Sequence, residues 1–305
     1  MAHNHSHDHA HDHHHSANKK ALFISFLLIT LFMLLEVVGG FITNSLALLS
    51  DAGHMLSDAV ALGMSLLAFK LGEKASDQEK TFGYKRFEIL AAFLNGIALI
   101  AISFYILWES IQRFIDPPEV ASTGMLIIAA IGLLVNILVA WILMKGDTSE
   151  NLNLRSAFLH VLGDLLGSIG AIIAALLIMF AGWNYADPIA SALVALLVLV
   201  SGIRVTKDSF HVLMEGTPSN IDLEEVKSTI IELDGVQSIH DVHIWNITSD
   251  FPSFTCHVVV KKGTNRDQLL QWIGNKLDEQ FDLTHTTIQM ECDTSEIKKQ
   301  EHNCN

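Results

Sequence analysis

The sequence predicts a membrane α-helical protein with six transmembrane helices, followed by a cytoplasmic α+β domain of ferredoxin-like type in the order αββαβ. Half of the 305 residues are hydrophobic and only 17% are charged, against roughly a quarter in an ordinary soluble domain. Six apolar stretches long enough to cross a bilayer lie between residues 21 and 206. After Pro218 the composition becomes that of a small soluble domain.

Polar loops, prolines and glycines delimit the six predicted spans. Lys19 and Lys20 precede the first, and Pro117 with Pro118 ends the third, because proline cannot continue a helix there. Glu36 lies within the first span, and we expect it to face other helices rather than lipid. The predicted spans cover about residues 21–43, 46–70, 84–114, 124–144, 154–180 and 188–206.

The distribution of lysine and arginine predicts the orientation of these spans. An even number of spans puts both termini on one side, and Arg113 is the lone lysine or arginine among the loops of the opposite side. Positive residues concentrate on the cytoplasmic side of a membrane protein. We therefore expect a multi-pass protein of the cytoplasmic membrane with both termini in the cytoplasm.

The chain ends and the net charge narrow the possible partners. Residues 1–18 carry eight histidines in the first fifteen positions, which predicts a disordered tail that binds divalent metals loosely. An expression tag is the alternative, and the interspersed Asp8 and Asp12 disfavour it.

The net charge of −14 argues against nucleic acid as a partner. The three cysteines have no framework spacing, which favours a reducing compartment; they are Cys256, Cys292 and Cys304.

The predicted domains are a six-helix membrane domain at 19–213, a cytoplasmic domain at 214–293 and a flexible tail at 294–305. Within the cytoplasmic domain, apolar residues at helical spacing predict helices at 222–233 and 266–281. Alternating patterns predict strands at 236–248, 254–260 and 283–291, with Asp250 and Pro252 in the turn between the first two strands. This order suggests helices on one face of a three-stranded sheet.

Two His–Asp pairs lie inside the second and fifth spans. His54 and Asp58 are four residues apart, as are His160 and Asp164, so each pair occupies one face of a helix. Ionisable groups at membrane depth persist mainly where they pair, line a pathway or bind something. Each residue alone could be a helix-packing hydrogen-bonder. Two imidazoles and two carboxylates, however, are a full tetrahedral set for Zn²⁺, and the repeated pair favours a metal site.

Such a site would couple metal to protons. A zinc ligand must be deprotonated, so an arriving metal ion expels any proton held there. Imidazole titrates close to physiological pH. Two conformations that open the site to opposite sides would therefore exchange metal for protons.

Four motifs give the chain a resemblance to the cation diffusion facilitators, in the zinc-exporting branch of the bacterial cobalt-zinc-cadmium efflux type. The resemblance covers residues 20 to about 291. It rests on Ser50-Asp51-Ala-Gly-His54-Met-Leu-Ser-Asp58, Phe82-Gly-Tyr84-Lys-Arg86-Phe-Glu88-Ile-Leu, His160-Val-Leu-Gly-Asp164 and Met214-Glu215-Gly-Thr-Pro218.

The resemblance implies a six-span homodimer in membrane lipid that exports Zn²⁺ from the cytosol in exchange for protons. It implies that the two His–Asp pairs hold the transported ion. It also implies a preference for zinc over cadmium, which the family associates with a histidine at position 54. Such a protein would protect the cell from excess metal, with cadmium, cobalt and other divalent cations as possible further cargoes.

The last strand suggests a second metal site in the cytoplasmic domain. His285, Thr287, Gln289 and Glu291 share one face by alternation, and His257 lies on a neighbouring strand. With His240 these residues offer three histidines and a carboxylate. The resemblance implies a regulatory metal held by His240, His257 and Glu291, with His285 as a further candidate. Solvated histidines at the sheet edge are the alternative, and we expect His243 to be a surface residue.

Two positions depart from the family pattern. Some members bind a further metal in the loop between the second and third spans, and Tyr84 replaces a ligand there, so we expect no tight site. Cys292 and Cys304 are too far apart to take over the zinc-binding cysteine pair of other members.

Two other functions would also use a buried metal site. An intramembrane metallohydrolase is disfavoured by four ligands, because catalytic zinc normally keeps an open position, and by the lack of a His-Glu-x-x-His motif. A membrane-anchored metal sensor is disfavoured by the duplicated intramembrane pair. We therefore expect no enzymatic activity.

Arg86 and Glu215 flank the membrane part on its cytoplasmic side and carry opposite charges. We expect them to pair, within or between subunits, as a hinge through which metal in the cytoplasmic domain acts on the membrane domain. A positive anchor at lipid headgroups is the alternative for Arg86.

Overall fold

The computed structural model describes residues 11–72, 78–144, 151–248 and 251–292, and within them it leaves the side chains of 11–22, 65, 68–72, 143–144, 151–164 and 292 undescribed. The chain forms two compact units. The first comprises Met1–Ala75 and Ala91–Lys207, and the second comprises Ser76–Leu90 and Asp208–Asn305. The segment after the second helix thus groups with the C-terminal domain, while the predicted domain boundaries stay predictions.

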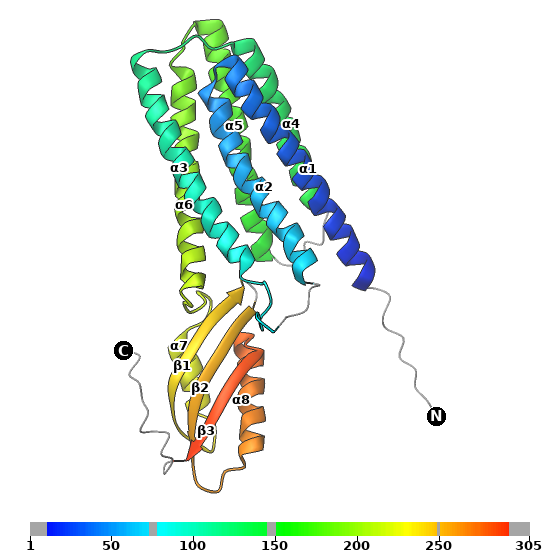
Figure 1. Cartoon of the computed structure of the whole chain (residues 1–305), viewed down its shortest axis with the longest axis vertical. Helices are drawn as coiled ribbons and strands as arrows, with labels where there is room; N and C mark the ends of the chain where they lie inside the picture. Colours follow the sequence, from blue (N-terminus) through cyan, green and yellow to red (C-terminus); the bar gives the residue numbers. More distant parts are fainter. Residues whose placement is uncertain (1–10, 73–77, 145–150, 249–250, 293–305) are drawn as a thin grey trace. The chain divides into compact units, whose positions relative to one another are not determined.

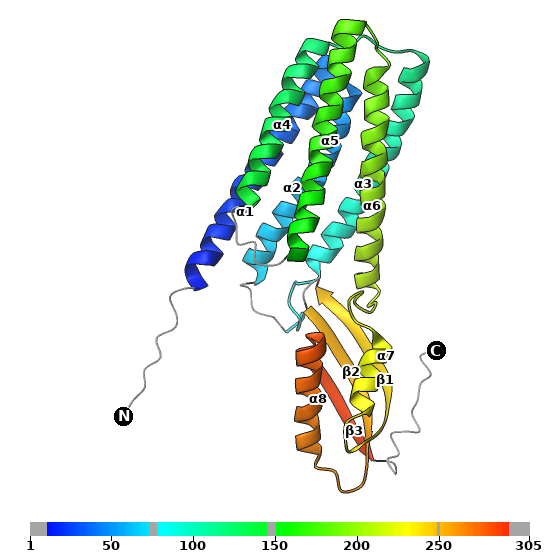
Figure 2. The ribbon, with the colours of Figure 1, turned by 180° about the vertical axis from the view of Figure 1, so that it is seen from behind.

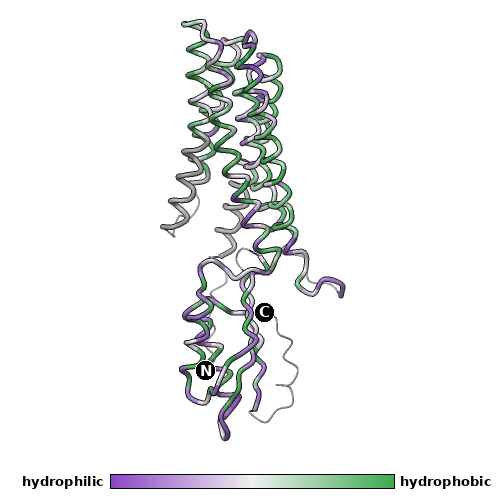
Figure 3. The backbone as a smooth tube through the Cα atoms, turned by 90° about the vertical axis from the view of Figure 1, so that its left-hand side faces the viewer, coloured by the Kyte–Doolittle hydropathy of each residue, from purple (hydrophilic) through white to green (hydrophobic). Residues whose placement is uncertain are grey.

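The first unit is built on six long helices, which run alongside one another in Figures 1 and 2. They are α1 (His11–Thr43), α2 (Leu46–Gly72), α3 (Phe87–Ile115), α4 (Ser122–Met144), α5 (Asn151–Ala181) and α6 (Ala186–Leu213). Within the described residues, four segments are long and apolar enough to cross a membrane: Phe23–Thr43, Phe87–Ile115, Ser122–Ile142 and Ala186–Leu213. In Figure 3 the described parts of the long helices are coloured mainly as hydrophobic.

Helix α1 begins at His11, earlier than the predicted span and inside the tract expected to be disordered. Residues 11–38 contain neither glycine nor proline, so no helix-breaking residue separates the end of the histidine tract from the apolar segment. The helix therefore starts inside the predicted tail, the disorder of that tail stays a prediction, and residues 1–10 lie outside the described part.

Close helix packing brings α1 against α2 and α4, and α5 against α2 and α4. One cluster of buried apolar side chains joins α1, α2 and α4, and it contains Ile29, Phe32, Met55, Ala59 and Val139. Elsewhere small residues allow the backbones to approach. A Cβ atom added to Gly96 of α3 would lie 2.9 Å from the backbone nitrogen of Thr206 in α6. The packing of α5 against α2 places these two helices, which carry the two His–Asp pairs, side by side.

The start of α2 is fixed by a buried carboxylate from α6. Asp187 is fully buried and accepts hydrogen bonds from Ser45 Oγ at 2.7 Å, Leu46 N at 2.9 Å and Ala47 N at 3.1 Å. The first backbone N–H groups of a helix lack partners within the helix, and an acceptor there stabilises it. Arg113 of α3 supplies the countercharge, with Nη1 3.7 Å from Asp187 Oδ2.

The second unit contains a three-stranded sheet in the order β1-β2-β3. Strands β1 (Val236–Thr248) and β2 (Phe251–Val260) are antiparallel, and β3 (His285–Cys292) lies parallel to β2. Helices α7 (Leu223–Ile231) and α8 (Arg266–Phe281) complete the predicted αββαβ order. Asp222, expected as the first helical residue, is instead the N-cap of α7.

Strand β2 begins at Phe251, so Pro252 belongs to the strand and pairs with Asn246 rather than forming part of the turn. A proline is tolerated near the start of a strand because few ladder hydrogen bonds are lost there. The expected turn between β1 and β2 is correspondingly shorter, and its residues 249–250 lie outside the described part.

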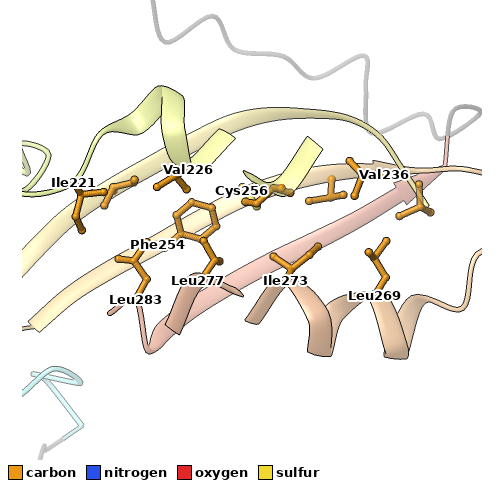
Figure 4. Close-up of a cluster of buried hydrophobic side chains, with 13 residues drawn as sticks. Ile221, Val226, Val236, Phe254, Cys256, Leu269, Ile273, Leu277 and Leu283 are labelled. Atoms are coloured by element: carbon orange, nitrogen blue, oxygen red, sulfur yellow. The ribbon is translucent and has the colours of Figure 1, made fainter. Parts of the chain in front are cut away.

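One apolar core holds the second unit together (Figure 4). Helix α8 contributes Leu269, Ile273 and Leu277, all at most 1% exposed, against Phe254 and Cys256 of β2. Burial raises the pKa of the Cys256 thiol to about 12. A thiol with so little thiolate is a poor nucleophile and metal ligand, so Cys256 is a core residue.

The cap on α2 gives a first prediction. We expect Asp187→Ala to destabilise the membrane unit by at least about 1 kcal/mol, the usual loss for an N-cap, because the N–H groups of Leu46 and Ala47 lose their acceptor. The melting temperature of the purified protein in detergent measures the effect. Asp116→Ala, at an exposed loop aspartate, is the matched control, and equal melting temperatures for the two variants would contradict the role of Asp187.

Candidate metal sites

The first candidate site begins with His54 and Asp58, one turn apart on α2. Asp58 is only 7% exposed and His54 is half-buried. His160 and Asp164 are likewise four residues apart on the neighbouring helix α5, but their side chains lie outside the described part. The structure thus places the two predicted pairs on adjacent helices, and the convergence of the four ligands stays a prediction.

Four further polar side chains are buried on α1, α2, α4 and α5. The sequence did not single out two of them, Asn136 and Ser168. Glu36 is fully buried, which confirms that it faces other helices. Asp51, one turn from His54, is 2% exposed and accepts a hydrogen bond from Ser168 Oγ at 3.2 Å. Asn136 of α4 donates in turn to Ser168 Oγ at 3.3 Å. A single amide or hydroxyl within an apolar helix is the available sequence signal, and it is a weak one.

The second candidate site lies in the sheet of the second unit. Strand pairing sets His240 of β1 opposite His257 of β2, with 5.2 Å between their ring centroids. Glu291 of β3 is 2% exposed, and its Oε1 lies 2.9 Å from His257 Nδ1. One ligand atom from each of the three residues lies within 4.8 Å of the others. Three of the four predicted cytoplasmic residues therefore come together.

The buried carboxylate leaves one oxygen available to a cation. Glu291 Oε2 is buried without a hydrogen-bond partner among the described residues, and it lies 3.7 Å from His240 Nε2. A buried oxygen without a donor is costly, and a metal ion between the carboxylate and the two imidazoles would satisfy it. Two imidazoles and a carboxylate are donors that suit Zn²⁺.

A β-bulge brings a fourth residue, and the second carboxylate, near the cluster, which the alternation pattern could not reveal. The register of β1 shifts between His240 and His243, and Asp241 there has a positive φ of 50°. Asp241 Oδ2 lies 3.7 Å from His257 Nε2, and its Oδ1 lies 3.0 Å from His243 Nε2. His243 itself is half exposed, which confirms it as a surface residue.

His285 does not join this cluster. It stands opposite Ser253 in the register, whereas Glu291 stands opposite Val259, and six residues of strand span roughly 20 Å. The ring of His285 instead packs on Phe251 at 5.3 Å and on Phe82 at 5.9 Å. The structure therefore does not support His285 as a ligand of this metal site, because two residues on the same face of a strand can lie far apart along it.

The predicted pair of Arg86 and Glu215 is present within the second unit. Both guanidinium nitrogens Nη1 and Nη2 of Arg86 lie 3.3 Å from Glu215 Oε1. The side chains are 39% and 64% exposed, and exposed pairs contribute little, about 0–1 kcal/mol. The pairing is confirmed, and the hinge role stays a prediction.

Comparison with known proteins covers both units. Residues 22–214 match the family model described as the cation efflux transmembrane domain, and residues 218–293 match that of the cation efflux protein, cytoplasmic domain. Among solved structures, the metal-bound C-terminal domain of the CzcD transporter from Cupriavidus metallidurans is 43% identical, covering 23% of this chain and 99% of its own, with a TM-score of 0.23.

Curated relatives match over nearly the full chain. The cadmium, cobalt and zinc/H(+)-K(+) antiporter of Bacillus velezensis is 60% identical over 95% of this chain and 92% of its own length. Zinc transporter ZitB of Escherichia coli K12 is 48% identical over 95% and 93%. The metal cation efflux system protein CzcD of Cupriavidus metallidurans is 43% identical over 90% and 87%. The chain is a membrane protein and belongs to the cation efflux, or cation diffusion facilitator, family.

Proposed function

We propose that this protein is a Zn²⁺/H⁺ antiporter that exports zinc from the cytosol and so protects the cell from excess metal. The observation that carries the proposal is its 60% identity, over 92% of the relative's length, to a protein named as a cadmium, cobalt and zinc/H(+)-K(+) antiporter. Cadmium and cobalt are further candidate cargoes on the same ground. The relatives are named as transporters, which favours transport over a metal sensor or a metallohydrolase.

The proposed transport site consists of His54 and Asp58 on α2 with His160 and Asp164 on α5. The packing of α2 against α5 supports this set, and the burial of Asp58 removes competing water. Zinc would bind the deprotonated ligands and protons would replace it. Access to the two sides in turn would make the cycle an export of metal in exchange for protons.

The proposed molecule has six membrane crossings with both termini in the cytoplasm, and its second unit is a ferredoxin-like domain. The αββαβ order with β3 parallel to β2 supports that fold. It works as a homodimer in the lipid of the cytoplasmic membrane. Regulatory Zn²⁺ binds His240, His257 and Glu291, and the buried oxygen of Glu291 supports this role.

Zinc flux tests the transport site. We expect Asp58→Asn to reduce zinc uptake into sealed vesicles by at least about tenfold. Losing a residue that only hydrogen-bonds to a metal ligand already costs about 10–100-fold, and Asp58 is a proposed ligand itself. Purified protein in liposomes with an internal zinc dye gives the rate. Asp116→Asn, an exposed loop variant, should keep wild-type uptake, and wild-type uptake in Asp58→Asn would refute the assignment.

Zinc binding by the full-length protein tests the cytoplasmic site. His257→Ala and Glu291→Gln should each lower the zinc affinity of the cytoplasmic site by at least about tenfold, since each removes a proposed ligand. Titration calorimetry in the Asp58→Asn background isolates this site.

His285→Ala is the matched control for the cytoplasmic site, because it removes a histidine from the same strand face at a distance. It should leave the calorimetric titration unchanged. Weaker zinc binding in His285→Ala than in His257→Ala would show that the three-residue cluster is the wrong ligand set.

A double-mutant cycle tests the proposed hinge. Arg86→Ala and Glu215→Ala should each lower zinc-stimulated flux, and the double variant should lose no more than either single one, because a broken pair cannot be broken twice. Zinc flux measured over a range of zinc concentrations on the cytoplasmic side gives the readout. If the two single effects simply add, the residues do not act as a pair.

A further inference from the structure

Four helices of the first unit each direct a polar side chain into the same buried region. Glu36 of α1 and Ser168 of α5 are fully buried, while Asp51 of α2 and Asn136 of α4 are 2% and 7% exposed. Charged and polar groups inside an apolar helix bundle are costly, and those that persist commonly mark ion or proton pathways. None of the four belongs to the proposed metal-ligand set.

The hydrogen bonds in this region run toward Asp51. Asn136 Nδ2 donates to Ser168 Oγ at 3.3 Å, and Ser168 Oγ donates to Asp51 Oδ2 at 3.2 Å. Asp51 therefore accepts at the end of a hydrogen-bonded chain that starts on α4 and passes through α5.

Glu36 has the opposite environment. Both its oxygens are buried, and neither accepts a hydrogen bond of ordinary geometry within the described part of the chain. Its Oε1 lies against Gly132 of α4, one turn from Asn136, whose amide leads through Ser168 to Asp51. Two adjacent carboxylates away from water cannot both stay ionised without a cation between them.

Two glycines leave the space that these carboxyl groups occupy. A Cβ atom at Gly132 of α4 would lie 3.3 Å from Glu36 Oε1, besides crowding the Phe32 ring. A Cβ atom at Gly167 of α5 would collide with Asp51 Oδ1. The neighbouring helices α4 and α5 thus each leave room for one of the two carboxyl groups.

We propose that Glu36 and Asp51 form a second cation site that holds one proton on Glu36 and releases it when zinc binds at His54 and Asp58. Asp51 precedes His54 by three residues, about 4.5 Å along a helix axis, so a divalent ion at the metal site favours the ionised form of Glu36. The Glu36 carboxylic acid becomes a carboxylate, and the proton leaves to solvent. It returns when the metal departs, and one proton per cycle then comes from a residue that never touches the metal.

The test measures protons and zinc together in the full-length protein. This inference rests on the proposed Zn²⁺/H⁺ exchange, so the wild-type protein must first release protons as it binds zinc; its failure to do so would remove the proposed function itself. Zinc binding is followed by calorimetry and proton release by a pH-sensitive dye in weakly buffered detergent solution. Glu36→Gln, which is uncharged at every pH, should still bind zinc but release about one proton fewer per zinc.

Two further variants separate the possible outcomes. Glu119→Gln, at an exposed loop position, should keep the wild-type ratio, and Glu36→Asp, which retains an acid, should restore most of it. A wild-type proton-to-zinc ratio in Glu36→Gln overturns the proposal. If the wild-type protein requires potassium for zinc transport and Glu36→Gln loses that requirement at an unchanged proton ratio, the site holds a monovalent metal ion and the proposal is overturned.

Infrared difference spectroscopy on the wild-type protein covers the case in which Glu36→Gln does not fold. Addition of zinc should remove the carbonyl band of a buried carboxylic acid, and Glu36→Asp should shift that band. A band that zinc does not change, or that Glu36→Asp does not move, overturns the assignment of the proton to Glu36.

Discussion

The cost of an unsatisfied charge in an apolar helix bundle governs the first unit. Asp187 is tolerated because it caps α2 and faces Arg113. Asp51 is tolerated because Ser168 donates to it. Each of these two carboxyl groups thus joins its helix to another, so buried charges also fix helix packing. The proposed metal ligands on α2, His54 and Asp58, follow these two anchors along the helix, whose first turns are thereby held against α6 and α5.

In the second unit the constraint is strand register. Pairing of His240 with His257 puts two imidazoles side by side. The parallel pairing of β3 with β2 brings the Glu291 carboxylate within reach of His257. The apolar core formed by α8 and β2 holds this register. A metal ion bound to three strands would stabilise the sheet as a whole, by about 2.7 kcal/mol at a free concentration one hundred times the dissociation constant. Metal binding and domain stability are therefore linked in the proposed regulation.

Much of this could be predicted from sequence, for identifiable physical reasons. Hydrophobic length located the long helices, and helical spacing put His54 and Asp58 on one face of α2. Alternation assigned Glu291 to the correct strand but also suggested His285, because period two reports a side chain's face and not its distance along the strand. Asp241 was missed because a bulge interrupts the alternation. Asn136 and Ser168 were missed because single polar residues in apolar helices are common, and only packing shows that they point at Asp51.

In the proposed cycle, zinc and protons move in opposite directions through one protein. The direct measurement is simultaneous recording of zinc uptake and internal pH in liposomes containing the purified protein, with a pH gradient as the only driving force. Uphill zinc accumulation that dissipates the acid-inside gradient, and stops when an ionophore collapses it, is the predicted result. Zinc accumulation that continues against its own gradient after the pH gradient is abolished would contradict the account.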